Sequence, residues 1–405
     1  MKGWIKTISL VFLLTGCQQE DDWWGRNDFG ETNRIQFAVP SLSVAEVRST
    51  SKNVLENGDI FGVLGYCVPY VVGSTNMDYN AGTSEWSVKK SQSFADVFDC
   101  QPVKIVNGGG QYNMDGGTDS NNPKFWYSDG RGLDGKENLN VVNAENYHYS
   151  FIGYYPYSFK ERNDYFSVSY PSNLNSKPYG PPIITFTMPQ SGENSGAIDT
   201  NPLDHTLTPD AMLGVIYNHT KADGNLRFNF SHMLTALGFE INNYSDYYKL
   251  TIHAVKLRGK FFKQISVNFN NNPIEFSFPD TRYTGYYQLL GEDLSLNPVT
   301  GEPVQSSGLL GGEHLLLISG ENDYFGENVE VVVDYTFEDG HVPERRTFTQ
   351  ARPGTFVPRP GVKYTAQLNF VGDTFVLQFV VDNNESWEDG EADDNQTDND
   401  DVTFE

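Results

Sequence analysis

The sequence predicts an all-β fold of two tandem β-sandwich domains with long loops. Three observations lead to this prediction. Aromatic residues make up 14% of the chain and glycine contributes 38 residues, a composition that suits strands connected by turns. Short segments of alternating apolar and polar residues recur at a spacing of roughly ten residues, and long helical periodicity is missing. At 405 residues, the chain is long enough for two domains with a core each.

The formal net charge of −25 excludes one class of function. Nucleic-acid binding requires a basic surface, which so acidic a chain is not expected to supply. The acidity favours solubility and says little about the fold.

The first residues are typical of a targeting segment, predicted to span residues 1–16. Lys2 and Lys6 form a basic region before a short apolar run, Ile8–Leu14, and a Leu-Thr-Gly-Cys sequence closes it. This pattern predicts a lipoprotein signal peptide that is cut before Cys17, whose thiol then takes a diacylglycerol and anchors the chain to a lipid bilayer. Residues 17–32 are predicted to form an acidic tether, and its acidic run Gln18–Asp22 resembles the export signal of outer-membrane surface lipoproteins. No apolar run is long enough to span a membrane.

Alternating segments define the predicted strands of the N-terminal domain, which is assigned to residues 33–207. Pro40 interrupts the first strand and cannot donate to a β-ladder, so this strand is expected at a sheet edge. Residues 107–122 are predicted to form a loop. The predicted strands are Arg34–Val47, Asp59–Val72, Val103–Val106, Tyr147–Phe159 and Ile183–Met188.

The C-terminal domain is assigned to residues 208–387, and an acidic tail over residues 388–405 is expected to be disordered. Its cleanest alternation runs over Val329–Phe337, and Glu338–His341 is predicted to form the hairpin turn that follows. The predicted strands are Ala211–Tyr217, both halves of Leu226–Asn242, Tyr248–Lys256, Ile265–Phe269, Ile274–Phe278, Leu315–Ile318, Val329–Phe337, Thr347–Gln350, Thr365–Phe370 and Phe375–Val381.

The segment Leu226–Asn242 changes its alternation halfway. Its apolar residues are even-numbered before His232 and odd-numbered after it. Strand side chains alternate between two faces, so this change of parity requires an extra residue or a short turn. We predict a helical turn or bulge at Ser231–Ala236, which lets both halves face one core while the chain changes sheet or strand.

Two cysteines remain after Cys17. Cys67 and Cys100 belong to a compartment that permits disulfides, and both a bridge and two buried free thiols fit the sequence. No third thiol or nearby set of histidines accompanies them, so no metal site and no cofactor are predicted.

The sequence carries no recognisable catalytic constellation, and no enzyme activity is predicted. It lacks the nucleophile-elbow, zinc-protease, P-loop and dinucleotide-binding motifs. His232 follows Ser231, but a nucleophile and its base come from separate strands, so His232 is expected to close a turn through a backbone hydrogen bond. The carboxylates of Asp115–Asp119 and Asp129–Asp134 could wrap Ca²⁺, but neither loop fits the calcium-loop pattern and turn formation explains both compositions.

Aromatic pairs raise the question of glycan binding, in which sugar faces stack on exposed rings. In an alternating strand one ring of each pair points inward, so core packing explains most of them. The candidates are Trp126, Tyr127, Tyr154, Tyr155, Tyr286 and Tyr287.

Several motifs carry a resemblance to a known family. Asp210–Gly214 reads D-A-M-L-G, and Phe228–Ile241 reads F-x-F-x-H-x-L-x-x-L-x-F-x-I. Tyr147–Tyr157 ends in Y-Y-P-Y, Pro360–Leu368 reads P-G-V-K-Y-T-A-Q-L, and Trp387 precedes the tail. In this order the motifs resemble the fimbrillin family, the Mfa-like, type V pilin-like surface lipoproteins of Bacteroidota. The resemblance implies two transthyretin-like, Greek-key β-sandwiches and a role in fimbriae and cell adhesion.

The resemblance also implies a mode of assembly. In polymerising members an Arg-specific protease removes the first strand, and a strand from the neighbouring subunit fills the groove. Here that strand would be Ile35–Val47, with cleavage between Arg48 and Ser49; retention of the strand is the alternative. The donor strand could be Phe375–Val381 or Val402–Phe404. The long acidic tail departs from a stalk subunit and favours an accessory, tip or anchor role.

The sequence therefore predicts a non-catalytic, lipid-anchored protein of the outer membrane and cell surface, or of the fimbrium after processing. Its expected partners are the bilayer, through acylated Cys17, other fimbrial subunits, through donor-strand addition, and a surface glycan or protein. The alternative is a stand-alone outer-membrane lipoprotein that binds glycan through exposed aromatics.

Overall fold

The computed structural model describes residues 33–42, 55–69, 94–112, 123–157, 165–170, 172–174, 177–189, 197–269, 275–299, 305–320, 324–339, 342–351 and 356–381. The predicted all-β fold of layered sheets is confirmed over these ranges. Strands form five sheets, one of them only the pair β8 (Ser172–Leu174) and β9 (Lys177–Tyr179). Among the described residues, single 3-10 turns lie at Ala144–Asn146 (η1), His205–Leu207 (η2), Lys221–Asp223 (η3) and Leu310–Gly312 (η4).

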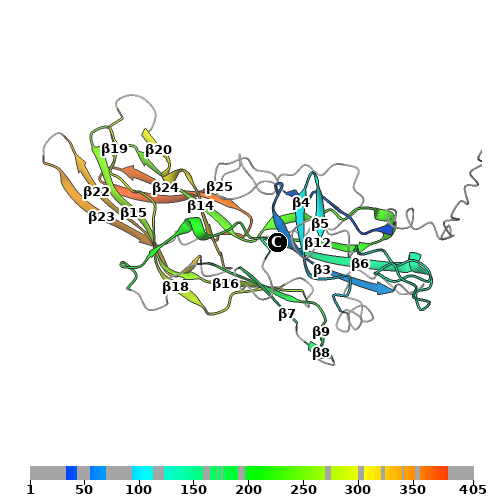
Figure 1. Ribbon diagram of the computed structural model, residues 1–405. Helices are drawn as coiled ribbons and strands as arrows, with labels where there is room; N and C mark the ends of the chain where they lie inside the picture. The colour runs from blue at the N-terminus through cyan, green and yellow to red at the C-terminus, as the bar shows by residue number, and fades with distance from the viewer. Residues whose placement is uncertain are drawn as a thin grey trace, which may run out of the picture.

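An eight-stranded sheet forms the first half of the molecule (Figure 1), in the order β1-β5-β4-β3-β6-β12-β13-β2. Its two edge strands, β1 and β2, are separated only by Val39 and Pro40, so the sheet curls until its edges meet and closes as a barrel. The strands are β1 (Phe37–Ala38), β2 (Ser41–Leu42), β3 (Ile60–Pro69), β4 (Phe98–Val106), β5 (Gly109–Tyr112), β6 (Tyr147–Tyr155), β12 (Met212–His219) and β13 (Asn229–His232).

A four-stranded sheet covers the outer face of this barrel, in the order β17-β16-β10-β7. Side chains alternate along β6, so Phe151 points into the barrel while Tyr154 points outward and packs 5.4 Å from the ring of Phe166. The hydroxyl of Tyr66 reaches the backbone oxygen of Gly180 at 3.2 Å. The strands are β7 (Phe166–Ser169), β10 (Ile183–Thr187), β16 (Gln264–Asn268) and β17 (Glu275–Ser277).

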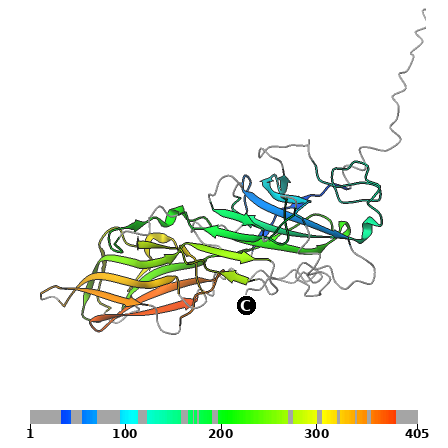
Figure 2. The same cartoon turned by 90° about the horizontal axis from the view of Figure 1, so that it is seen from below.

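Two further sheets pack face to face as a sandwich in the second half of the molecule (Figures 1 and 2). One contains β11 (Pro202–Leu203), β15 (Lys249–Phe262), β18 (Arg282–Gln288), β19 (Leu294–Leu296), β22 (Gly326–Glu338) and β23 (Glu344–Ala351). The other contains β14 (Thr235–Asn243), β20 (Gln305–Leu309), β21 (Leu315–Leu317), β24 (Lys363–Val371) and β25 (Thr374–Val381). The predicted alternation of Val329–Phe337 holds in β22, and β22 pairs with β23 as the expected hairpin.

Strands on both sides of the predicted boundary between residues 207 and 208 share sheets. β12 and β13 follow that boundary in sequence but complete the first barrel. Only Lys263 separates β15 from β16, so the chain passes directly from the sandwich to the four-stranded sheet. There β16 pairs with β10 over five residue pairs. Backbone hydrogen bonds between strands therefore join the two halves. The sequence alone does not show which strands form these bonds.

The segment Leu226–Asn242 crosses between the two halves without a helical turn. β13 ends at His232 and β14 begins at Thr235, leaving Met233 and Leu234 as the link. The expectation that both halves face one core is wrong: Phe230 lies in the barrel core, whereas Phe239 lies in the sandwich core. The change of parity marks a change of sheet and of core together.

The prediction also missed strands within segments assigned to loops. β5 lies inside the predicted loop 107–122, where Asn107 and Gly108 adopt positive φ and turn the chain back onto β4.

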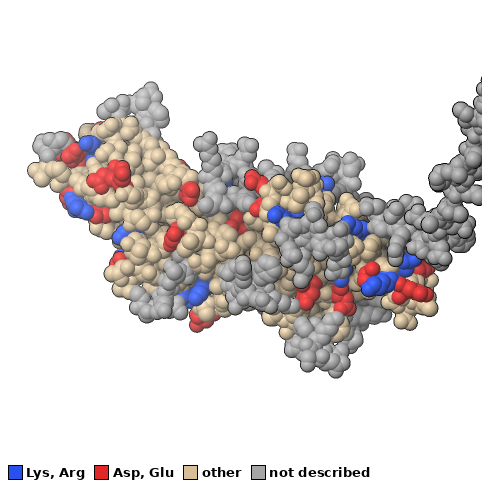
Figure 3. Space-filling model, viewed as in Figure 1, with Lys and Arg blue, Asp and Glu red and all other residues tan. Residues whose placement is uncertain are grey.

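Acidic and basic side chains are interspersed over the face shown in Figure 3. No helix in the described residues is long and apolar enough to cross a membrane.

Candidate strand-addition site

The segment Asn33–Leu42 lies in a groove between β5 and Leu226–His232. Phe37 pairs with Gly110 on one side and with Leu226 on the other. The amide of Leu226 donates to Gln36 O at 2.8 Å, and the amide of Ser41 donates to Phe228 O at 3.0 Å. Because both edges of the segment are hydrogen-bonded, it is the strand that closes the barrel.

Two side chains of this segment fill the barrel interior. Ile35 is fully buried, and the Phe37 ring lies within 6.3 Å, centroid to centroid, of four other aromatic rings, those of Phe61, Phe98, Tyr112 and Phe228. A Cβ on Gly110 would lie 2.7 Å from Phe37 Cβ, so only glycine leaves room for the ring at this position. Polar residues alternate with these two, as expected for a strand with one buried face.

Hydrogen bonds from other parts of the first half also hold the segment in place. The Tyr112 hydroxyl donates to Ile35 O at 2.8 Å, and burial raises the pKa of Tyr112, which keeps the donor protonated. The Lys221 ammonium donates to the side-chain oxygen of Asn33. Trp126 donates its backbone N–H to Asn33 O at 2.8 Å. The start of the segment is therefore tied to three separate elements.

Removal of this segment would open the barrel along one line. β5 and the stretch before β13 would lose their backbone partners, and the site of the Phe37 ring would become an apolar pocket. An edge with unpaired N–H and C=O groups beside such a pocket is a template for an added strand, with main-chain bonds giving affinity and pockets giving register.

The predicted processing and lipidation residues lie outside the described parts of the chain. Cys17, Arg48 and Ser49 are among them, as is the C-terminal half of the predicted first strand, residues 43–47. The described part of the strand ends at Leu42, so the structure does not test the predicted cleavage position.

One of the two predicted donor strands is an integral part of its own domain. Phe375–Val381 forms β25, which pairs with β24 over eight residue pairs and buries Phe375 and Leu377 in the sandwich core. Donating this strand would open the sandwich that contains it. The other candidate, Val402–Phe404, lies outside the described residues.

Cys67 and Cys100 are free thiols in the structure. Cys67 packs against the barrel core, whereas Cys100 belongs to the cluster on the opposite face of the sheet. A disulfide requires Cβ atoms within bonding reach, which thiols on opposite faces do not provide. Of the two alternatives the sequence left open, the structure contains the pair of free thiols.

His232 closes the crossover between the two halves. Its Nδ1 lies 2.7 Å from Asp210 Oδ1, and both side chains are only 2% exposed. Asp210 precedes β12, which pairs with β13 through Met212 and His232. The sequence singled out both residues within one motif, but their contact was not foreseen because 22 residues separate them.

The aromatic candidates for glycan binding are mostly core residues. Trp126, Tyr154, Tyr155 and Tyr287 are at most 8% exposed, and Tyr127 and Tyr286 are half-buried. The exposed rings in the described parts of the chain are instead Tyr244 and Tyr247, which the sequence analysis did not select. Their position in a turn between two strands was the available signal.

The carboxylate loops do not form a metal centre where the structure describes them. In the 129–134 loop, Asp129 accepts from the amide of Ala144 at 2.8 Å and Asp134 accepts from the amide of Lys136 at 3.0 Å. These carboxylates stabilise turns, as the loop composition suggested. Residues 115–119 are outside the described ranges, and no group of three or more His, Cys, Asp or Glu within those ranges could hold a metal ion.

One histidine beside the strand makes stability depend on pH. The His219 ring stacks on Trp126 at 5.6 Å, its Nε2 lies 3.1 Å from Gly224 O, and burial lowers its pKa below 6.5. The pKa of His219 is therefore lower in the folded chain than in the unfolded chain, where it is about 6.5. At a pH between these two pKa values the unfolded chain binds more protons, so we expect the free energy of unfolding to fall as pH drops below about 6.5. Urea midpoints at pH 7.5 and pH 5.5 should differ more for the native chain than for His219→Gln, and equal differences would contradict this role.

No protein-family model and no curated protein matches the chain. Among solved structures, it is similar to a candidate cell adhesion protein from Bacteroides ovatus, with 14% identity, a TM-score of 0.40, and coverage of 87% of this chain and 97% of that one. It is also similar to the fimbrial anchor protein Mfa2 from Porphyromonas gingivalis (8% identity, TM-score 0.28, coverage of 86% and 97%). The C-terminally truncated tip fimbrial protein Mfa3 of that organism gives 8% identity, a TM-score of 0.28 and coverage of 86% and 98%. Likenesses of this size establish neither a family nor a function for this chain.

Proposed function

We propose that this protein is a non-catalytic, lipid-anchored component of surface fimbriae, with an accessory, tip or anchor role, that joins other subunits by β-strand addition. One observation carries the proposal. The first strand, Asn33–Leu42, is hydrogen-bonded on both edges and supplies two core side chains to a barrel that is otherwise formed by later parts of the chain. Such a strand can be replaced by an equivalent strand from another subunit without changing the register of the barrel.

The lipid anchor and the strand lie in an order that suits this role. Cys17 precedes the strand and Arg48 follows it in sequence. A chain that keeps its leader stays attached to the outer membrane through the acylated cysteine. A chain cut after Arg48 would lose the anchor and the covalent link to its first strand together.

The N-terminal sequence and intact mass of the protein recovered from the cell surface test the anchor role. We expect a chain that begins at Cys17 and carries acyl groups, because the long acidic tail argues against a stalk subunit. In such a chain the first strand stays in its groove, and the protein would join other subunits as the donor of a strand. A chain that begins at Ser49 would overturn the permanent anchor and assign the protein to the polymerising subunits.

Strand exchange is tested separately. After cleavage at Arg48, a labelled peptide of residues 33–48 should replace the bound fragment and remain attached until the sample is boiled. A Phe37→Ala peptide should fail to do so, and the uncleaved Arg48→Ala protein should not exchange. Equal incorporation of both peptides would show that the groove does not recognise the strand.

A second candidate function is glycan capture by a stand-alone outer-membrane lipoprotein. The exposure of Tyr244 and Tyr247 favours it. The two functions are compatible in one molecule, since the rings and the strand lie in different halves of the chain.

A further inference from the structure

The loop between β14 and β15 lies at the end of the sandwich far from the N-terminal strand (Figure 1). It carries two exposed aromatic rings. Tyr244 and Tyr247 have 47% and 77% of their surface exposed, and no other aromatic side chain in the described ranges is classed as exposed. The chain otherwise places its rings in cores, so the exposure of two in one short loop calls for a physical reason.

Two buried polar residues fix the shape of this loop. Asn243 is fully buried, and its side-chain N–H groups donate to Tyr248 O and Asn297 O at 3.0 Å each. Its side-chain oxygen accepts from the backbone N–H of Ser245 at 3.0 Å. The Ser245 hydroxyl accepts from the amides of Tyr247 and Tyr248 at 3.2 and 2.9 Å. The rings therefore stand on a pre-organised backbone, which lowers the entropy lost when a ligand binds.

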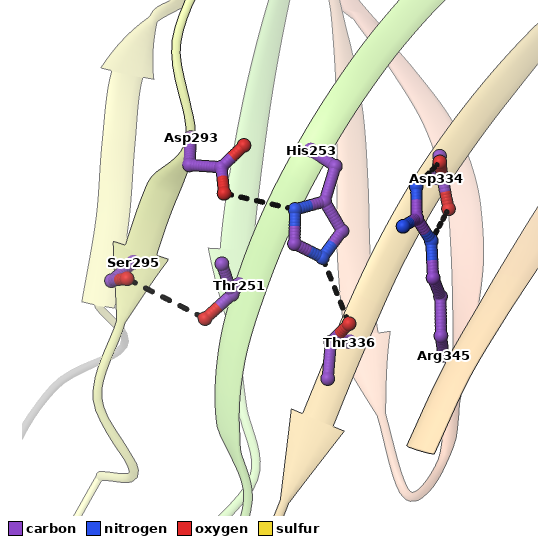
Figure 4. Close-up of polar contacts among 7 residues, drawn as sticks. All are labelled: Thr251, His253, Asp293, Ser295, Asp334, Thr336 and Arg345. Carbon is purple, nitrogen blue, oxygen red and sulfur yellow. Dashed lines mark hydrogen bonds and ion pairs between the residues drawn. The ribbon is translucent and has the colours of Figure 1, made fainter. Parts of the chain in front are cut away.

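A row of polar side chains lies along the outer face of β15, β19, β22 and β23, the sheet that the chain enters as β15 directly after the loop (Figure 4). His253 occupies its centre, with Nδ1 3.0 Å from Asp293 Oδ2 and Nε2 2.8 Å from the Thr336 hydroxyl. Arg345 donates to Asp334 at 3.1 Å, and Lys249, two residues after Tyr247, pairs with Glu338 at 3.7 Å. The row thus offers hydroxyl, imidazole, guanidinium and carboxylate groups that are already held in place.

The row suits binding better than catalysis. Its carboxylate–imidazole–hydroxyl order is that of a hydrolase triad. Thr336, however, is a paired residue of β22, with Thr251 on one side and Arg345 on the other. Its neighbouring backbone amides belong to the sheet ladder, so they are not free to stabilise an oxyanion.

The size and charge of the surface select the ligand. The two rings offer roughly 250 Å² at their exposed fractions, taking about 200 Å² for each aromatic side chain, whereas a stable protein interface needs about 800 Å² per partner. A sugar ring matches one aromatic face in size, and an oligosaccharide that continues along β15 from the stacked ring would satisfy the polar row with its hydroxyls, since six residues at about 3.3 Å each separate Tyr247 from His253. The net charge of −25 and the carboxylates of the row disfavour an anionic ligand.

We propose that Tyr247, together with the polar row centred on His253, binds a neutral glycan. The inference rests on the adhesive role proposed above and places the adhesive site at the end of the molecule opposite the strand. Tyr247 supplies a stacking face, and the hydroxyl, imidazole and guanidinium groups of the row supply hydrogen bonds to sugar hydroxyls.

Affinity electrophoresis of the full-length protein in gels containing dextran, mannan or galactan tests the proposal. We expect at least one polysaccharide to retard the protein. Tyr247→Ala should weaken binding about tenfold, as expected for the loss of one stacked ring, while Tyr247→Phe keeps it. Val342→Ala is the matched control, because Val342 is 84% exposed and lacks a ring. The melting temperatures of all three variants should equal that of the native chain.

Two results would overturn the inference: no retardation in any of the gels, or equal retardation of the native protein and Tyr247→Ala. Neither result bears on strand addition, because the substituted side chain lies outside the barrel. Exchange of the labelled 33–48 peptide by cleaved Tyr247→Ala protein would confine the failure to the glycan site. Absence of that exchange in the cleaved native protein would instead count against the proposed fimbrial role.

Discussion

Replacing Phe37 with alanine is expected to lower the free energy of unfolding by about 4 kcal/mol, the cost of removing a buried phenylalanine that leaves a cavity. The ring is 4% exposed and is surrounded by four other aromatic rings. The barrel has little freedom to collapse into the space, because β5 approaches the strand through Gly110. Loss of the ring therefore weakens the strand that closes the barrel.

Urea unfolding followed by tryptophan fluorescence measures this effect. Trp126 is the one tryptophan among the described residues and belongs to the same core as Phe37. Val376→Ala is a suitable control, because Val376 is 51% exposed on a strand of the other half, and it should change stability by less than about 0.5 kcal/mol. A loss below about 1 kcal/mol for Phe37→Ala would mean that the strand contributes little to the core.

Replacing Asp210 with alanine is expected to cost about 3 kcal/mol. The substitution removes the acceptor for His232 Nδ1 at a site where both side chains are buried, and water cannot replace it without reopening the core. The pair joins the start of β12 to the end of β13, immediately before the chain crosses into the sandwich. Its loss should therefore destabilise both halves.

Asp293→Ala provides a matched control for this prediction. Asp293 also contacts a histidine, His253, but its side chain is 62% exposed, so its loss should cost less than about 1 kcal/mol. Thermal unfolding of the two variants should separate them clearly. Equal losses would show that burial of the Asp210–His232 pair does not determine its contribution.

Local patterns predicted the elements whose partners are adjacent in sequence. The alternation of Val329–Phe337 and the turn after it gave both the strand and the hairpin to β23, because register there depends on one short connection. The closure of the barrel by Asn33–Leu42 depends on contacts with Leu226 and Phe228, nearly 190 residues away. Alternation records that one face of this strand is buried but not which strands lie beside it.

The candidate site was predictable to the same extent. The first strand and its buried face followed from Ile35 and Phe37 and from the family resemblance. The change of alternation around His232 was recognised from the sequence. It is compatible with strands that face one core and with strands that face two different cores. The pairing of β14 with β24 shows that the two strands face different cores. Tyr247 was missed because the exposure of its ring depends on how Asn243 holds the loop. Asn243 does so partly through a hydrogen bond to Asn297, more than 50 positions away in the sequence.

The shared four-stranded sheet has a mechanical consequence. β10 and β16 come from different halves of the chain, and five residue pairs join them. β15, which continues into β16, is 14 residues long and spans roughly 46 Å at about 3.3 Å per residue. A pull between the two ends of the molecule would therefore meet a continuous strand and a ladder of hydrogen bonds rather than a flexible linker. The two halves should respond to tension as one stiff rod.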